Sequence, residues 1–376
     1  MTARAVGRRT ALALLLGAAA GCGASQGATG PGSAGKPSAP GGGASPGRSG
    51  PAAPRPGTSP AAPGRIRTVT SVREGLPGMR PLRFHSSIGP GPAIAPIGLT
   101  PDGKVLASLL DARGVGSAVA LVDPGTGAAT VLSRFQDGSG GALKTRQSYS
   151  GVADARHVAW LDSAAQGEAA GWRLMVHDRA SGRTRVAARS GTPVAEAGDL
   201  SLADGRLRWS ASRGGSRSAM VMRPGDSAPK VWRAKTGAAQ PYGRDVVAVA
   251  GDRLVRFSAE GRRREVLAEY VTAFAAAGDV LAWCPGEGVI VRLGDGSRLE
   301  LPEEPALTMS ADGPLVAWQA ETGGAVLDTR TRVLTRLPKA TSFVLAAGGH
   351  LLWGVADRAG DPQPRSRTTY HLARIA

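Results

Sequence analysis

The sequence predicts an all-β domain built from repeated four-stranded units, preceded by an export signal and a flexible spacer. From about Ile66 onward, short runs of Val, Leu, Trp and Thr are broken by Asp-Gly, Gly-Asp, Pro-Gly and Thr-Gly pairs. This pattern is typical of strands joined by tight turns. Helical periodicity is not sustained anywhere in this part, and a hairpin whose second strand ends in Trp recurs along it. These observations predict the fold class.

The first residues have the order of a secretory signal. Arg4, Arg8 and Arg9 precede an apolar run over residues 11–20 that is rich in Leu and Ala. The run is too short to span a bilayer, and small residues follow it, as they do before a cleavage point. We therefore expect residues 1–21 to be a signal peptide. Arg8 and Arg9 also resemble the pair that the twin-arginine translocase reads, with Sec export as the alternative.

Ala19-Ala20-Gly21-Cys22 resembles the bacterial lipobox, which the lipoprotein diacylglyceryl transferase and signal peptidase II read. Ala19 departs from the usual motif, in which Leu or Val is commoner at that place. The resemblance implies that Cys22 becomes the first residue of the mature chain and carries a diacylglycerol. Two acyl chains give stable attachment, here to the outer face of the cell membrane. Ordinary secretion, with Cys22 lost in the discarded peptide, is the alternative.

After Cys22 the chain is almost entirely Gly, Ala, Ser and Pro up to Gly64. Such a composition lacks the apolar residues that would offset the entropy of ordering, so we expect a disordered spacer. The predicted organisation is a signal peptide over residues 1–21, a lipidated linker over 22–65 and a β domain over 66–376.

The formal net charge of +17 raises the question of a nucleic-acid partner. Arg is abundant, Lys is scarce and Asn is absent, which is typical of a protein from a GC-rich genome. The only tight basic run, Arg262–Arg264, stands between Glu260 and Glu265 where a turn between strands is expected. We therefore expect no nucleic-acid partner, although anionic lipid headgroups or wall polymers would attract such a domain weakly.

The repeat has the period of a β-propeller blade. Hairpins ending in Trp recur at Trp160, Trp209, Trp283, Trp318 and Trp353, and the last three stand 35 positions apart. A second hairpin follows several of them, which gives four antiparallel strands in roughly 35 to 50 residues. Two further units lack the Trp, one with its hairpin over 100–107 and one over 245–267. We expect about seven four-stranded blades, with six as the alternative.

The last unit has strands near Phe343, Leu351 and Tyr370 but ends before a fourth. We expect the missing strand to come from the start of the domain, from 66–72 or from 82–85. A ring closed in this way leaves no open edge, which is the main hazard of a β sheet.

The repeated Asp-Gly hairpin and Ala-Trp strand resemble the TolB-like and WD40-like propellers of bacterial envelope proteins. The resemblance covers residues 66–376, without the regular Gly-His and Trp-Asp pairing of true WD40 repeats. In those proteins the propeller mostly binds other proteins. The resemblance therefore implies a binding or scaffolding module for a protein or cell-envelope component.

No pattern in the sequence predicts catalytic residues, a metal site or a cofactor. Gly98–Lys104 has P-loop spacing, but Val105 replaces the Ser or Thr that would hold magnesium, so we expect a hairpin turn. The adjacent Glu303 and Glu304 would point in opposite directions along an extended chain. Cys284, which has no disulfide partner once Cys22 is lipidated, fits a buried inert thiol. The five histidines show no metal-ligand spacing: His85, His157, His177, His350 and His371.

The repeated Trp residues are expected to pack between neighbouring blades, whereas Trp172 and Trp232 break the register and are expected at the surface. We expect a monomer that acts outside the cell. The alternative function is a propeller hydrolase or lyase acting on an extracellular glycan, peptide or lactone. Such an enzyme would gather its catalytic groups from several blades around the central channel.

Overall fold

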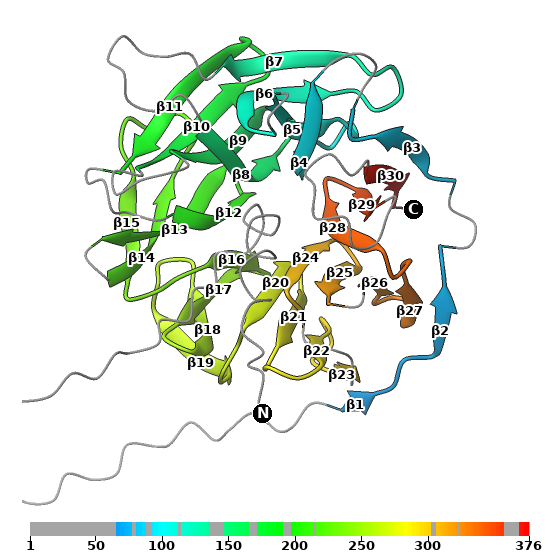
Figure 1. Ribbon diagram of the computed structural model, residues 1–376. Coiled ribbons are helices and arrows are strands. Elements are labelled where there is room, and N and C mark those ends of the chain that lie inside the picture. The colour runs from blue at the N-terminus through cyan, green and yellow to red at the C-terminus, as the bar shows by residue number, and fades with distance from the viewer. Residues whose placement is uncertain are drawn as a thin grey trace, which may run out of the picture. The chain divides into compact units, whose positions relative to one another are not determined.

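Seven β-sheets are arranged about a common axis (Figure 1). Each has four antiparallel strands at its centre. In six sheets these four strands are consecutive in the chain, and in the seventh a strand from the start of the domain closes the ring. The computed structural model describes residues 65–76, 80–87, 92–111, 114–134, 146–164, 171–190, 197–213, 216–301, 306–321, 323–356 and 368–375. All regular elements within these ranges are strands. No helix in the described part of the chain is long and apolar enough to cross a membrane.

Each blade runs outward from the axis in chain order. Blade 1 consists of β4 (Ala93–Leu99), β5 (Val105–Leu110), β6 (Gly116–Val122) and β7 (Ala129–Arg134). Blade 2 consists of β8 (Arg146–Ala153), β9 (His157–Ala164), β10 (Trp172–Asp178) and β11 (Arg183–Arg189). Blade 3 consists of β12 (Ala197–Ala203), β13 (Arg206–Arg213), β14 (Ser216–Met222) and β15 (Lys230–Ala234).

The remaining blades repeat this order. Blade 4 consists of β16 (Ala239–Tyr242), β17 (Asp245–Ala250), β18 (Arg253–Ser258) and β19 (Arg263–Ala268). Blade 5 consists of β20 (Ala273–Ala277), β21 (Val280–Cys284), β22 (Val289–Arg292) and β23 (Arg298–Leu301). Blade 6 consists of β24 (Thr308–Asp312), β25 (Leu315–Ala320), β26 (Gly323–Asp328) and β27 (Val333–Arg336). The inner three strands of blade 7 are β28 (Thr341–Ala347), β29 (His350–Ala356) and β30 (Thr368–Arg374).

The predicted seven-bladed propeller is confirmed, and the alternative of six blades is wrong. Two blades lack the Trp: blade 1, which has Ala107 there, and blade 4, whose β17, β18 and β19 lie where the sequence placed three strands. The second strand of blade 4 holds Ala248 at the position that Trp occupies in five other blades. The turn pairs and the alternation of apolar residues were sufficient to define this blade without its Trp.

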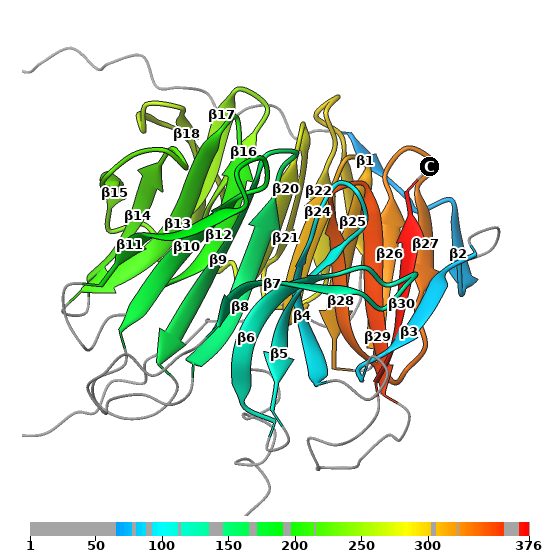
Figure 2. The ribbon, with the colours of Figure 1, turned by 90° about the horizontal axis from the view of Figure 1, so that it is seen from above.

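The ring is closed by the start of the domain. Strand β3 (Leu82–His85) pairs antiparallel with β30 and completes blade 7, so the second of the two proposed segments supplies the missing strand. The other segment forms β1 (Ile66–Arg67) and β2 (Ser71–Glu74), which pair parallel to β23 and β27 as fifth outer strands. The chain thus passes along the rim of blades 5, 6 and 7 before it enters blade 1 (Figures 1 and 2).

The tryptophans of the repeat pack between blades, as predicted. Each faces the preceding blade: Trp160 packs with Leu106 and Val119 of blade 1, and Trp318 with Ala282 and Cys284 of blade 5. All five are buried, and so is Cys284. Burial of such large apolar side chains at five of the seven interfaces contributes much of the energy that holds the ring together.

The prediction for Trp172 is wrong. It is 6% exposed and lies edge-on against Trp209 with ring centroids 6.2 Å apart, because it starts β10 on the face that packs on blade 3. Trp232 is half-buried rather than fully exposed, and its indole N–H donates to Ala259 O at 3.0 Å. A Trp outside the repeat register can therefore still pack against an apolar side chain of the neighbouring blade.

Candidate functional site

The first strand of each blade faces the axis, and in four blades a polar side chain of this strand bonds to the backbone of the next blade. Tyr149 OH donates to Ala197 O at 3.0 Å, which joins blades 2 and 3. Ser201 Oγ donates to Ala239 O at 3.0 Å, which joins blades 3 and 4. Two further side chains accept a backbone N–H of the next blade: Gln240 Oε1 from Ala276 at 2.7 Å and Ser310 Oγ from Ala346 at 2.9 Å. These four axial side chains thereby help to fix neighbouring blades together.

Asp199 is the carboxylate that stands out on these inner strands. A bulge interrupts the pairing of β12 between Gly198 and Ser201, and the backbone of Asp199 there is left-handed, with φ of 55°. Ser210 Oγ donates to its Oδ2 at 2.9 Å. Burial raises the pKa of the Asp199 carboxyl, while the Ser210 hydroxyl and the Arg217 guanidinium oppose that rise. A strained, half-buried acid of this kind is typical of functional positions.

The interface between blades 3 and 4 contains a second unusual charge, Arg208 on β13. Counting from the turn that closes the first hairpin of each blade, the corresponding residues of the other blades are all apolar and all buried. They are Leu106, Ala159, Val247, Ala282, Ala317 and Leu352. Because Leu207 and Trp209 pack on blade 2, alternation along β13 directs Arg208 toward blade 4.

Arg208 is only 3% exposed, and its Nε and Nη1 have no hydrogen-bond partner among the described residues. Burial lowers the pKa of its guanidinium, and the nearby charge of Arg206 acts in the same direction. The charge of Asp204 opposes this lowering, but burying a guanidinium two of whose nitrogens lack hydrogen bonds to described residues is still costly, so its presence needs a physical reason. One reason is space: blade 4 has Ala248 where a Trp would otherwise fill this interface.

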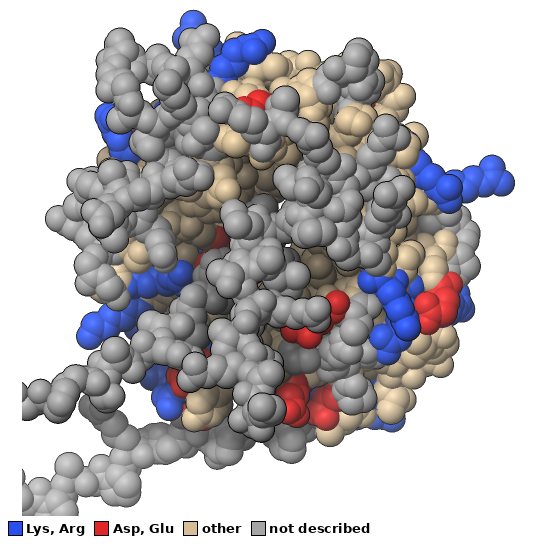
Figure 3. All heavy atoms as spheres, viewed as in Figure 1, with Lys and Arg blue, Asp and Glu red and all other residues tan. Residues whose placement is uncertain are grey.

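The same interface opens at the surface into a hollow of about 530 Å³. We call it the 3–4 hollow; its lining residues are Ser216, Arg217, Lys235, Thr236, Gly237, Val249 and Gly251. Figure 3 shows Lys and Arg side chains gathered on this face where blades 3 and 4 meet. Among the described residues that line the hollow, two are cations and none is Asp or Glu.

The backbone around the hollow holds these cations in place. A Cβ added to Gly237 would lie 3.2 Å from Cδ of Arg217, so a larger residue there would push the arginine stem by a few tenths of an ångström. Lys235 has a φ of 54°, which is rare for a residue with a side chain, and its side chain is exposed. The arrangement presents two positive groups at the mouth of a blade interface.

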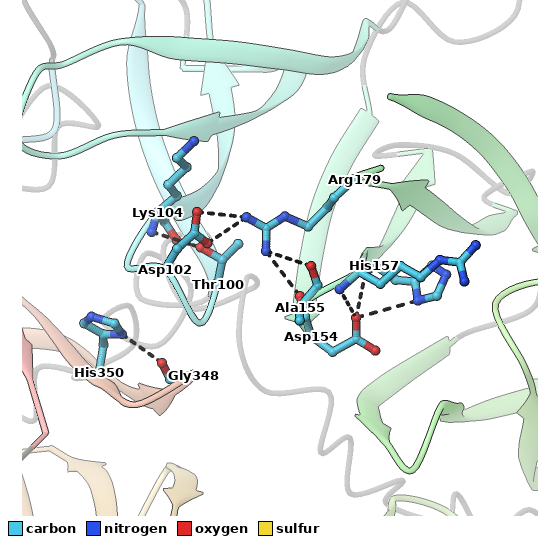
Figure 4. Close-up of polar contacts among 10 residues, drawn as sticks. Thr100, Asp102, Lys104, Asp154, Ala155, His157, Arg179, Gly348 and His350 are labelled. Atoms are coloured by element: carbon cyan, nitrogen blue, oxygen red, sulfur yellow. Dashed lines mark hydrogen bonds and ion pairs between the residues drawn. The ribbon is translucent and has the colours of Figure 1, made fainter. Parts of the chain in front are cut away.

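The opposite ends of the blades carry tight turns instead. Gly98–Lys104 closes a hairpin, as predicted, with Lys104 N donating to Thr100 Oγ1 at 2.9 Å (Figure 4). In the same turn Asp102 accepts two hydrogen bonds from Nη2 of Arg179, each 2.8 Å long, which join blades 1 and 2. The Asp123 and Asp328 side chains cap turns by accepting backbone N–H groups of Gly125 and Arg330. These turns are structural joints between strands.

The residues that the sequence singled out for export and anchoring lie outside the described residues. They are Arg8, Arg9, Ala19, Ala20, Gly21 and Cys22, and the pair Glu303 and Glu304 also lies outside. The five histidines belong to separate environments; His371, for example, stacks on Trp353 at 5.0 Å. In the described ranges no three His, Cys, Asp or Glu side chains are grouped so that they could hold a metal ion.

The sequence did not point to Asp199, Arg208, Arg217 or Lys235. One signal was present: the Leu-Ala-Trp pattern of the repeat becomes Leu207-Arg208-Trp209 in blade 3. An alignment of the units marks this Arg as a charge at a core position. The other three residues have no pattern of their own, because their meeting depends on a bulge and on the packing of two blades.

The sequence matches no protein-family model and no curated protein. The WD40 domain of Neurospora crassa Pan2 has a similar structure, with a TM-score of 0.50 and 11% identity over 81% of this chain and 98% of that one. A prolyl endopeptidase superposes with a TM-score of 0.49 and 15% identity over 70% of this chain and 46% of that one. A Xanthomonas campestris gluconolactonase superposes at 0.43 and 13% identity, over 80% and 90%.

The likeness is one of fold. The predicted WD40-like β-propeller is confirmed by the seven-bladed ring and by the match to the Pan2 domain. Proteins with this fold carry unrelated functions, so the fold alone assigns neither a partner nor a reaction.

Proposed function

We propose that this chain is an exported lipoprotein, anchored through Cys22 to the outer face of the cell membrane. Its propeller would act there, as a monomer, as a binding or scaffolding module for a protein or cell-envelope component. The order of leader, lipobox-like motif and Gly/Ala/Pro/Ser spacer supports the anchor. A spacer of this composition gives the domain reach from the membrane surface.

The observation that carries the binding role is the use of the axial polar groups. Four axial side chains form hydrogen bonds with backbone groups of the next blade: Tyr149, Ser201, Gln240 and Ser310. A wall fixed in this way gives a rigid platform, and rigid platforms lower the entropic cost of holding a partner. The surface then offers loops and blade interfaces as recognition sites.

The anchor is tested by replacing Cys22 with Ala and measuring incorporation of radiolabelled palmitate and fractionation with membranes. We expect the C22A protein to lose the label and to appear in the medium or remain unprocessed. Cys284→Ala is the matched control, because Cys284 is the other cysteine of the chain and is buried. Mature C22A protein that stays on the membrane would refute the anchor.

The binding role is tested by cross-linking on intact cells and comparing the products of the anchored protein with those of the released C22A form. We expect one product of defined mass that depends on the anchored form and is competed by the purified full-length chain. Random products of many masses, equal for the two forms, would contradict a specific partner.

An enzyme is the second candidate, and Asp199 is the observation in its favour. Burial raises the pKa of this carboxyl beside the axis, as in many general acids. The candidate substrates are extracellular glycans, peptides and lactones. If turnover of one of these is found and Asp199→Asn abolishes it while the protein remains folded, the enzyme reading replaces the binding one.

A further inference from the structure

The 3–4 hollow has the size of a small-molecule site. Its volume of about 530 Å³ falls within the range of ligand pockets, which is roughly 300 to 1,000 Å³. It lies between blades 3 and 4, where the inner strands are bridged by Ser201 and Ala239. A site at the seam of two rigid blades is held in shape by both.

The charge of the hollow points to the chemical class of the ligand. Arg217 and Lys235 line it, and the charge of Arg217 also acts on the Asp199 carboxyl of β12. Lys235 has no acidic counterpart among the lining residues that the structure describes. Two cations facing one concavity favour a carboxylate or a phosphate, and a guanidinium matches the geometry of both.

Arg208 is an independent observation in the same blade interface. It is almost fully buried and retains two nitrogens without a hydrogen-bond partner among the described residues. A charge in a low-dielectric interface acts over a longer range than a charge in water. Its potential therefore adds to the attraction that Arg217 and Lys235 exert on an anion.

The neutral lining defines the rest of the ligand. Val249 and the two glycines offer an apolar, close-approach surface, while Ser216 offers a hydroxyl. Thr236 is buried, and its hydroxyl already donates to Ala234 O at 3.1 Å. A compact molecule with one anionic group and a small polar body, such as a sugar acid or a sugar phosphate, fits these features.

We propose that the 3–4 hollow binds a small molecule bearing a carboxylate or phosphate group, with Arg217 and Lys235 contacting the anion. The site deepens the proposed function, since it rests on the propeller being a binding module and names the chemistry of one ligand. Its test is made in solution and needs neither the lipid nor a macromolecular partner. A failed anchor or a missing partner is therefore distinguishable from a failure of this site.

The test is calorimetric titration of the purified full-length protein with inorganic phosphate and with D-glucuronate, with D-glucose as the neutral match for glucuronate. We expect saturable binding of at least one anion, no binding of glucose, and weakening as NaCl is raised. Lys235→Gln should weaken the anion about three- to tenfold, and Arg217→Gln about tenfold or more. Lys339→Gln is the matched control, an exposed lysine in the corresponding connection between blades 6 and 7.

Arg217 also offsets the charge of Asp199, so the R217Q protein is checked for folding by circular dichroism, and K235Q carries the decision if R217Q does not fold. Absence of saturable anion binding overturns the proposal, and so does an equal loss in K235Q and K339Q. A further arm uses phosphatidylglycerol vesicles with the C22A protein. Binding to the vesicles without binding to either free anion would assign the charges to a lipid surface and overturn the small-molecule site.

Discussion

Arg208 of blade 3 faces the position in blade 4 where Ala248 replaces the tryptophan of the repeat. In the interface of blades 5 and 6 the small side chain is on the earlier blade and the large one on the later blade, because Ala282 faces Trp318. A long side chain on one blade thus accompanies a short one on the next, and both interfaces are filled. The two departures from the repeat explain each other as one exchange of volume between neighbouring blades.

The exchange predicts a non-additive pair of substitutions. Ala248→Trp alone should overpack the interface against Arg208 and cost about 1–3 kcal/mol of the free energy of unfolding. Arg208→Ala in the same protein removes the obstruction and restores the Ala and Trp arrangement of blades 5 and 6. We expect the double variant to be more stable than the A248W protein in urea unfolding, with a coupling energy above about 1 kcal/mol.

The matched control introduces an Arg at a blade interface where a Trp already fills the space. Ala317 of blade 6 occupies the position of Arg208, and Trp353 of blade 7 stands opposite. Ala317→Arg should therefore destabilise by several kcal/mol, because it buries a charge and overfills the interface. Additive effects of R208A and A248W, or a tolerated A317R, would contradict the exchange of volume.

Closure of the ring by β3 predicts a strong dependence on Phe84. Its side chain is 7% exposed and packs on Tyr370 with ring centroids 5.4 Å apart. Phe84→Ala should cost about 3 kcal/mol in the free energy of unfolding. Leu82→Ala on the same strand is the control, because Leu82 is 42% exposed and little is lost with it. Similar unfolding midpoints for F84A and the parent protein would show that β3 does not hold the ring.

The fold was largely predictable from the sequence, because a repeat states its own period. The Trp hairpins gave the blades, the turn pairs gave the strand ends, and the short last unit showed that the ring needed a strand from elsewhere. Between the two candidate segments the sequence did not decide, since 66–72 and 82–85 both alternate and both pair with outer strands. Which blade each segment pairs with depends on the arrangement of the whole ring, and no local sequence pattern predicts it.

The candidate site was not predictable in the same way. Asp199, Arg217 and Lys235 lie on three different segments, and each looks like an ordinary polar residue in its own stretch. Their proximity arises from the bulge in β12 and from the meeting of blades 3 and 4. Trp172 shows the same limit, because its partner Trp209 belongs to the next blade and not to its own strand.

The raised pKa of Asp199 predicts that the stability of the protein changes between acidic and neutral pH. Since burial raises the pKa in the folded state, the unfolded chain releases this proton first as the pH rises. The folded state therefore loses stability as the pH rises from the ordinary Asp value through the raised one. Asp199→Asn should remove this loss, so the melting temperature of D199N should gain on that of the parent as the pH increases.

The Ser210 hydroxyl provides a second variant for this measurement. It donates to Asp199 Oδ2 and favours the charged carboxylate, so Ser210→Ala should raise the pKa further and move the loss of stability to higher pH. Melting temperatures recorded across the window test both variants. Identical pH profiles for the parent, D199N and S210A proteins would contradict a raised pKa at this position.

The ion pair between Asp102 and Arg179 predicts the opposite behaviour in acid. Partial burial would raise the pKa of the Asp102 carboxyl, but the hydrogen bond from Thr100 and the Arg179 guanidinium outweigh it and lower the pKa. The stability that this pair contributes is present above the ordinary Asp pKa and is lost as the pH falls through the lowered one. Asp102→Asn should therefore melt below the parent protein at neutral pH, and the difference should shrink in acid. Arg179→Gln should behave likewise, because Nη2 of Arg179 makes both hydrogen bonds to Asp102. A difference in melting temperature between D102N and the parent that persists at about pH 2 would assign the effect to the turn rather than to the charge.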